Sequence, residues 1–238
     1  MPDKRTHRGP NPADEKLFSK KATEVLRSAV ADFSLFLTKG YAPKSALKLV
    51  GDRFNLTQRQ RLAVMRTASS DEQRKERIKK CMTVKDCAEN PIAVDGYNLL
   101  ITIEAAMSGG CIFKAPDGCF KDLASIHGTY RKVDETIPAI ELIGNFLKEN
   151  NIKDCLWLLD SPVSNSARLK TLIEKIAGDN DWQWQVKLSL NPDAELIKTD
   201  RIITTSDSIV LDGCKKWVNL SYAIIDWKLP QTWIIDLS

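Results

Sequence analysis

Residues 92–100 read IAVDGYNLL, and this stretch decides the expected fold. Its first three residues form a short apolar run that is typical of a buried strand, and Asp95 stands at the end of that run. Gly96 follows and lets the chain leave the sheet sharply. A carboxylate in this position either caps the backbone locally or belongs to a functional site, and only the rest of the chain distinguishes the two.

The chain after residue 90 alternates short apolar runs with helical patterns. Strands are expected at 92–95, 155–160, 182–190, 201–205 and 222–226, with helices at 136–149 and 166–177 and a short helix from Pro192. This alternation is typical of a parallel sheet covered by helices on both faces. A late hairpin is also expected in IVLDGCKKWVNL, residues 209–220, where Asp212 and Gly213 supply a turn signal. We therefore expect an α/β domain over residues 90–238.

The front of the chain, residues 13–82, reads as a small all-helical domain. Helices are expected at 13–38, at 43–53, after Asn55 or Thr57, and from a cap at Ser70 to about Cys81. Residues 1–12 are polar and rich in proline and are expected to form a disordered tail. The second and third helices fit a helix-turn-helix that would present its polar side chains to a nucleic acid. Those side chains are Gln58, Arg59, Arg61 and Arg66, although any two short helices joined by a tight turn give the same pattern.

The charge is distributed unevenly along the chain. Residues 1–80 contain 19 Lys and Arg against 9 Asp and Glu, a net charge of +10, whereas residues 81–238 contain 16 against 22, a net charge of −6. A basic front suggests a partner that is a polyanion such as RNA, and the alternative is a set of solvated helices. The sequence has no apolar run long enough for a signal peptide or a membrane span, so a cytoplasmic location is expected.

Cysteine and histidine usage argues against zinc. The six cysteines never form a CxxC pair, and the chain has two histidines. The cysteines are expected to be reduced thiols that pack as small apolar residues.

Aspartates follow the first four expected strands of the α/β region. Asp95 ends the first strand, Asp160 ends the second in LLDSP, Asp193 opens the helix after the third, and Asp207 follows the fourth in ITTSDS. Each has a structural explanation on its own, since Asp193 suits a helix N-terminus, Asp160 a turn and Asp207 a helix cap. Together they would meet at the carboxyl edge of a parallel sheet, where ligands bind.

Carboxylates gathered at one edge repel one another and would raise one another's pKa unless a cation neutralises them. Oxygen ligands without nearby histidine or cysteine suit Mg²⁺ or Mn²⁺, and such an ion activates water for attack on a phosphodiester. The expected chemistry is hydrolysis of nucleic acid. Asn98 is a candidate for positioning a phosphate or a water, and Ser164 and Ser166 are candidates for holding a phosphate oxygen at a helix N-terminus. The motifs GxGxxG, GxxxxGK[ST] and GxSxG are missing from the sequence.

Several basic residues lie between the first strand and its following helix. They are either phosphate contacts near the acidic edge or solvated loop charges: Lys114, Lys121, Arg131 and Lys132.

Four short motifs carry a resemblance to a known family. VDGYNLL at 94–100, LLDSPVS at 158–164, NPDAEL at 191–196 and TTSDS at 204–208 resemble the successive motifs of PIN-like nuclease domains, in particular the NYN branch. From about residue 15 onward the chain also resembles a conserved prokaryotic family that joins a helical N-terminal domain of unknown function to a PIN-like domain. LTQRQRLAVMRTAS at 56–69 and PDGCFKDLASIHGTY at 116–130 carry that second resemblance.

The resemblance implies a three-layer PIN-like domain that acts as a metal-dependent endonuclease, with RNA as the expected substrate. The implied metal ligands are Asp95, Asp160, Asp193 and Asp207. Many PIN domains also place a glutamate on a helix between the first two strands; Glu141 is a loose match, and Asp117 or Asp122 are alternatives that would contact the site or substrate. The alternative function is a binding module that holds RNA or a protein without cleavage. The helical front could also mediate a homodimer or bind a partner protein.

Overall fold

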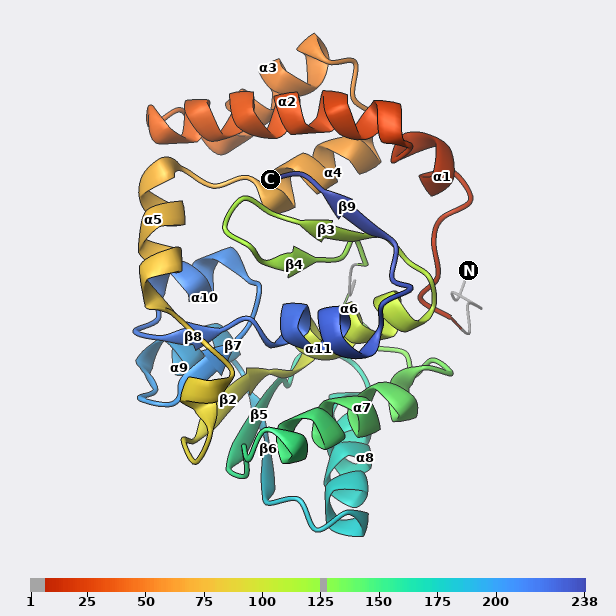
Figure 1. Cartoon of the computed structure of the whole chain (residues 1–238), viewed down its shortest axis with the longest axis vertical. Coiled ribbons are helices and arrows are strands. Elements are labelled where there is room, and N and C mark those ends of the chain that lie inside the picture. Colours follow the sequence, from red (N-terminus) through yellow and green to blue (C-terminus); the bar gives the residue numbers. More distant parts are fainter. Residues whose placement is uncertain (1–6, 125–127) are drawn as a thin grey trace.

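The computed structural model describes residues 7–124 and 128–238. Helices and two sheets pack together in one elongated body, with the helical front at one end and the α/β region at the other (Figure 1). Residues 1–6 of the expected tail and residues 125–127 of the family-like stretch lie outside the described residues.

The larger sheet has six strands in the order β1-β8-β7-β2-β5-β6, and all its pairs are parallel. The strands are β1 (Cys81–Met82), β2 (Ile92–Asp95), β5 (Cys155–Asp160), β6 (Trp184–Ser189), β7 (Ile202–Thr204) and β8 (Trp217–Val218). The expected α/β fold with a parallel sheet is confirmed.

Helices cover both faces of this sheet, which makes three layers. They are α6 (Gly96–Met107), α7 (Thr136–Glu149), α8 (Ser166–Asp179), α9 (Pro192–Lys198), α10 (Ser208–Gly213) and α11 (Leu220–Lys228). Successive residues of a strand point to opposite faces. Ile92 and Val94 accordingly pack with α6, α7, α8 and α11, whereas Ala93 packs with Leu196 of α9 and Val210 of α10.

The order of the strands creates a switch point beside β2. The chain runs from β2 to β5 and β6 on one side, then crosses to β7 on the other side of β2. The connections that leave β2 and β7 therefore diverge, α6 to one face and α10 to the other. In open parallel sheets the crevice between such connections is where ligands bind.

Two expectations for the end of the chain are wrong. The apolar run at 222–226 is part of α11 and not a strand, because Asn219 caps a helix by accepting a hydrogen bond from the backbone of Tyr222. The expected hairpin at 209–220 is instead α10 followed by β8, and β8 pairs in parallel with β7. Asp207 starts α10 through its side chain, and Gly213 is its last residue rather than part of a tight turn.

The helical front consists of α1 (Asp14–Leu17), α2 (Lys20–Thr38), α3 (Pro43–Arg53), α4 (Gln58–Thr67) and α5 (Asp71–Lys80). The helix expected over 13–38 is thus divided near Ser19, while Thr57 and Ser70 cap the N-termini of α4 and α5, each with a complete capping box. The last two residues of the expected helical domain form β1, the edge strand of the large sheet. A 3₁₀ turn at Lys85–Cys87 leads into β2.

A second, three-stranded sheet joins the helical front to the α/β region. Its strands are β4 (Phe120–Lys121), β3 (Ile112–Lys114) and β9 (Ile234–Asp236), in the order β4-β3-β9. Phe113 and Ile235 from this sheet share one apolar core with Phe33 of α2 and Val64 of α4. The two parts of the chain are therefore held together by buried apolar side chains, and the small sheet lies between them (Figure 1).

The expected tail 1–12 is described from residue 7 onward. Within it Arg8 forms an ion pair with the buried Glu104 of α6. All six cysteines are free thiols, five of them buried, as the sequence predicts. Among the described residues, no helix has the length and apolar character to span a membrane.

Candidate active site

A cavity of about 530 Å³ opens at the carboxyl ends of the central strands. Asp95, Asp160, Asp193 and Asp207 all line it, although each follows a different strand of the large sheet. Parallel strands bring their ends to one edge, and the switch point beside β2 leaves room there. The structure thus brings together the four aspartates that the sequence places at strand ends.

Asp95 is the most perturbed of the four carboxylates. Thr205 donates a hydrogen bond of 2.7 Å from Oγ1 to Asp95 Oδ2. Burial, helped by the charges of Asp207 and Asp193 and opposed by the Thr205 hydrogen bond, raises the pKa of Asp95 to about 7. The carboxyl group is surrounded by protein atoms, although the residue as a whole is only partly buried, because the cavity leaves it a solvent-facing side.

Asp160 and Asp193 show the same trend more weakly. Burial raises the pKa of both, and the charges of Asp207 and Asp160 add to the rise at Asp193. Asp193 lies in the first turn of α9, which Asn191 caps. Mutual repulsion between the carboxylates of the cavity is therefore part of the electrostatics of this site.

Asp207 acts as the cap of α10. Its Oδ1 accepts hydrogen bonds from the backbone of Ile209 at 2.8 Å and of Val210 at 3.2 Å. This is the structural role that the sequence allowed for it. While it caps the helix, the carboxylate of Asp207 also acts through its charge on Asp95 and Asp193.

The loop that carries Asp207 is fixed from two sides. Asn98 Oδ1 accepts hydrogen bonds from Ser206 N at 2.7 Å and from Ser206 Oγ at 3.0 Å. Lys121 Nζ donates to Ser206 O at 2.5 Å. Asn98 thus holds the loop, whereas the sequence suggested that it faces a phosphate or a water.

The donor set fits a hard cation chemically, since it offers carboxylate oxygens whose pKa values rise through burial and through one another's charge. The carboxylates are not drawn together into a tight cluster. Over residues 7–124 and 128–238, no three His, Cys, Asp or Glu side chains are close enough to one another to hold a metal ion by themselves. A bound ion would need waters or substrate oxygens to complete its coordination, as Mg²⁺ usually does.

Comparison with known proteins matches two consecutive parts of the chain to two families. A family model described as a domain of unknown function (DUF5616) matches residues 84–223, and one described as a protein of unknown function (DUF434) matches residues 25–80. The chain belongs to the DUF5616 family. It is also 31% identical over 199 residues to an uncharacterized protein of Methanocaldococcus jannaschii, a match that covers 84% of this chain and 93% of that protein. No solved structure matches the chain.

The acidic cavity lies mostly in the DUF5616 region, but the DUF434 segment contributes to its wall. Met65 and Arg66, at the end of α4, line it together with Ile209 of α10. Arg66 donates hydrogen bonds to the backbone oxygens of Asp122 at 2.6 Å and Ala124 at 3.0 Å. These residues cannot be assigned to the cavity from sequence, because the packing of α4 against the small sheet brings them there.

The other arginines of the expected helix-turn-helix bind within the protein. Arg59 forms an ion pair with the buried Asp14, and Arg61 pairs with Asp52. Their guanidinium groups stabilise the helical front.

The remaining candidate residues of the DUF5616 region are spread over the molecule. Asp122 lines the acidic cavity and accepts a hydrogen bond of 2.9 Å from Thr102 Oγ1. Ser164 and Ser166 are not among the residues that line it; Ser166 Oγ donates to the backbone of Ser161. Glu141, on α7, is exposed.

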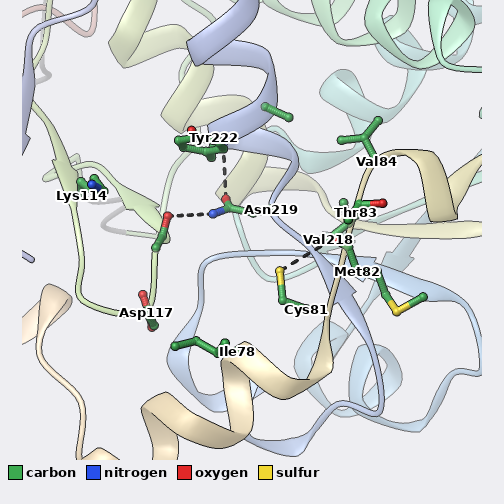
Figure 2. Close-up of a pocket in the computed structure, with 12 residues that line it drawn as sticks. Ile78, Cys81, Met82, Thr83, Val84, Lys114, Asp117, Val218, Asn219 and Tyr222 are labelled. Carbon is green, nitrogen blue, oxygen red and sulfur yellow. Dashed lines mark hydrogen bonds between the residues drawn. The ribbon is translucent and has the colours of Figure 1, made fainter.

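Asp117 lies at a second cavity, of about 440 Å³, shown in Figure 2. Its carboxylate is buried and pairs with Arg77 of α5 at 2.9 Å. Cys81 and Tyr222 lie on the other walls of this cavity, which is lined mainly by apolar groups. The position of Asp117 is that of a structural ion pair between the DUF434 segment and the turn before β4.

Lys121 and Tyr97 are two further residues of the acidic cavity. Lys121 is buried, and its contact with Ser206 places a cation beside the carboxylates. The basic stretch around it was the signal in the sequence. Burial, together with the charge of Asp160, raises the pKa of Tyr97 to about 12. In the sequence Tyr97 stands out only as part of the VDGYNLL motif, which gives it no role of its own.

Proposed function

We propose that this DUF5616 protein is a metal-dependent endonuclease that hydrolyses phosphodiester bonds, with RNA as its substrate. The observation that carries the proposal is the convergence of Asp95, Asp160, Asp193 and Asp207 on one cavity at the switch point of a parallel sheet. The resemblance of the motifs around these residues to PIN-like nuclease domains supports the same chemistry, although fold analogy alone does not establish an activity.

Mg²⁺ or Mn²⁺ is the cofactor that the carboxylates would hold. When bound, such an ion would lower the pKa of an attacking water and stabilise charge on the leaving oxygen. The four strand-end aspartates are the residues that would bind it. A cation is favoured there because burial disfavours the charged form of Asp95, Asp160 and Asp193 and raises their pKa values.

Asp95 is the central ligand in this proposal. Thr205 donates a hydrogen bond to its Oδ2 and so fixes the carboxylate in place. A bound cation would favour the ionised form of Asp95, which burial and the neighbouring carboxylates otherwise disfavour. Asn98 and Lys121 hold the loop bearing Asp207 in place, which keeps the acidic wall of the cavity rigid.

Two cations lie on the same wall of the cavity, where each already donates to backbone oxygens. Arg66 and Lys121 line the cavity beside the carboxylates, and each carries a charge that attracts a phosphodiester. The DUF434 segment would then contribute a substrate contact, since Arg66 belongs to α4.

The experiment is cleavage of end-labelled RNA by the purified full chain with Mn²⁺, with and without chelator. Wild-type protein is expected to cleave only with the metal, and Asp95→Asn to lose most of the rate, because the substitution removes a charged ligand of the ion. Asp226→Asn, at an exposed position on α11, is the matched control and should cleave like wild type. Equal rates for Asp95→Asn and wild type would refute the proposal.

The alternative is a module that binds RNA or a protein without cutting it. One observation favours it: the described residues contain no ready-made three-ligand metal cluster. This alternative predicts RNA binding that weakens steeply with salt, no cleavage with Mn²⁺, and no change in affinity for Asp207→Asn.

A further inference from the structure

Glu104 is a carboxylate in the interior of the α/β region. It belongs to α6, is fully buried, and lines neither of the two cavities described above. Its Oε1 accepts hydrogen bonds of 2.6 Å from Tyr130 Oη and of 2.6 Å from Thr136 Oγ1. Its Oε2 forms an ion pair with the guanidinium group of Arg8. Since a buried carboxylate is costly without a cation, Glu104 needs a positive partner.

The pocket around the guanidinium group offers two further contacts. The backbone oxygen of Arg131 accepts a hydrogen bond of 3.0 Å from Arg8 Nη2. The central carbon Cζ of the guanidinium group lies over the Tyr130 ring, 5.1 Å from its centroid, which is within the range of a cation–π contact. A guanidinium group suits this arrangement, because it is planar, donates hydrogen bonds in several in-plane directions and stacks on aromatic faces.

The walls of this pocket are fixed without Arg8. The backbone N–H of Tyr130 donates to Ser164 O at 3.1 Å. Thr136, the first residue of α7, accepts at Oγ1 a hydrogen bond of 3.0 Å from Val133 N. All the groups that surround the guanidinium lie in the region that matches DUF5616. Removal of the Arg8 side chain would therefore leave an acidic pocket with its acceptors in place.

Arg8 itself belongs to a loosely attached segment that precedes the helical front. Residues 10–13, which connect it to that front, are exposed. His7 is also exposed and contacts Glu135. The Arg8 side chain is 14% exposed and that of Glu104 is 0% exposed, so the ion pair runs from the surface to the interior. The guanidinium group is therefore the main anchor of this segment among the described residues.

We propose that Glu104, Tyr130 and the carbonyl oxygen of Arg131 form a guanidinium-binding site, which the chain's own Arg8 fills as a latch for the N-terminal segment. The site takes other guanidinium compounds when the Arg8 side chain is missing. This inference goes beyond the proposed nuclease function and does not depend on it, because none of the three groups lines the acidic cavity.

The test is chemical rescue of the full chain that carries Arg8→Ala, measured by thermal unfolding at neutral pH. The variant leaves Glu104 without its cation, so its thermal midpoint should fall by roughly 5 °C or more. Millimolar ethylguanidinium chloride should raise this midpoint in a saturable way, because the compound binds the folded state. In wild type the site is filled, so the same compound should leave the midpoint unchanged or lower it slightly, since guanidinium salts weaken apolar burial.

Three controls separate a specific site from a general salt effect. Ethylammonium chloride at the same concentration should not rescue Arg8→Ala, because an ammonium group lacks the planar fork of donors. Arg201→Ala removes the cation beside Asp154, whose carboxylate is half-exposed, and should not respond to ethylguanidinium. Arg8→Ala combined with Glu104→Gln should not respond either, since a neutral amide does not attract the cation.

A saturable rescue that requires Glu104 supports the site. The inference is wrong if the midpoint of Arg8→Ala equals that of wild type, does not rise with ethylguanidinium, or rises equally with ethylammonium or in the double variant. If Arg8→Ala does not fold alone, the same comparison is made on the yield of folded protein after dilution from urea. An equal yield with and without ethylguanidinium would then overturn the inference.

Discussion

Replacing Asp95 by asparagine should stabilise the folded protein at alkaline pH. The pKa of Asp95 is raised in the folded state to about 7, against an ordinary value of 3.8. The folded state therefore holds the proton more tightly than the unfolded state does. The contribution of Asp95 to stability is greatest below about pH 4 and falls as the pH rises towards 7, where Asp95 ionises inside the fold, and this contribution levels off above that.

The size of this penalty follows from the two pKa values. The interval between 3.8 and about 7 corresponds to about 4 kcal/mol, at about 1.4 kcal/mol for each pKa unit. Because the cavity leaves part of Asp95 open to solvent, screening reduces the figure, and we expect about 2 to 4 kcal/mol. Asparagine carries no charge and can still accept the hydrogen bond from Thr205.

The assay is urea denaturation of wild type and Asp95→Asn at pH 8 and pH 5, with chelator present. The variant should have the larger free energy of unfolding at pH 8, and its advantage should shrink by more than half at pH 5. Asp226→Asn should show no such dependence, since that residue is exposed. An Asp95→Asn protein that is less stable than wild type, or equally altered at both pH values, would refute the electrostatic account of the cavity.

Three further substitutions test the packing at the start of α6, with a control in α8, and the buried ion pair of Arg77 and Asp117. Gly96→Ala should cost about 1 to 3 kcal/mol in denaturant titrations, because its methyl group would overlap Leu159, whereas Gly178→Ala in α8, with open space around it, should be neutral or gain up to about 1 kcal/mol. Arg77→Met should lower the free energy of unfolding by about 3 to 5 kcal/mol, because it leaves the buried carboxylate of Asp117 without its cation; an unchanged thermal midpoint would contradict the role assigned to this ion pair.

Much of the fold is predictable from local signals. The pattern over 136–149 matches α7, and the apolar run at 155–160 matches β5, because each combines a clear period with a suitable length. The run at 222–226 misleads because a short apolar stretch fits a strand and a buried helix equally well. The capping by Asn219 and the burial of Ile224 and Ile225 against the helical layer decide in favour of α11.

Local sequence signals do not predict the small three-stranded sheet. Its strands β3, β4 and β9 have two or three residues each, too few for a period, and β9 pairs with β3 across more than a hundred residues of sequence. That sheet joins the DUF434 segment to the DUF5616 region. Its existence therefore also decides which helical residues reach the acidic cavity.

The residues of the acidic cavity also fall into those that the sequence predicts and those that it does not. Asp95, Asp160, Asp193 and Asp207 are predictable because strand ends in a parallel sheet must meet at one edge. Arg66 and Tyr97 are not, because the packing of α4 brings the first to the cavity and the close approach of α6 to β5 fixes the second. From the sequence Asp117 is a candidate site residue, but in the structure its carboxylate forms an ion pair with Arg77.

The central claim is that the strand-end aspartates hold a divalent cation. Its most direct test is an anomalous difference map from crystals of the wild-type protein soaked in Mn²⁺ at pH 8. The account predicts a peak inside the cavity in contact with Asp95 and at least one of Asp160, Asp193 and Asp207, and no peak there in Asp95→Asn. A cavity without manganese in the wild type, under conditions where the ion binds elsewhere on the protein, would contradict it.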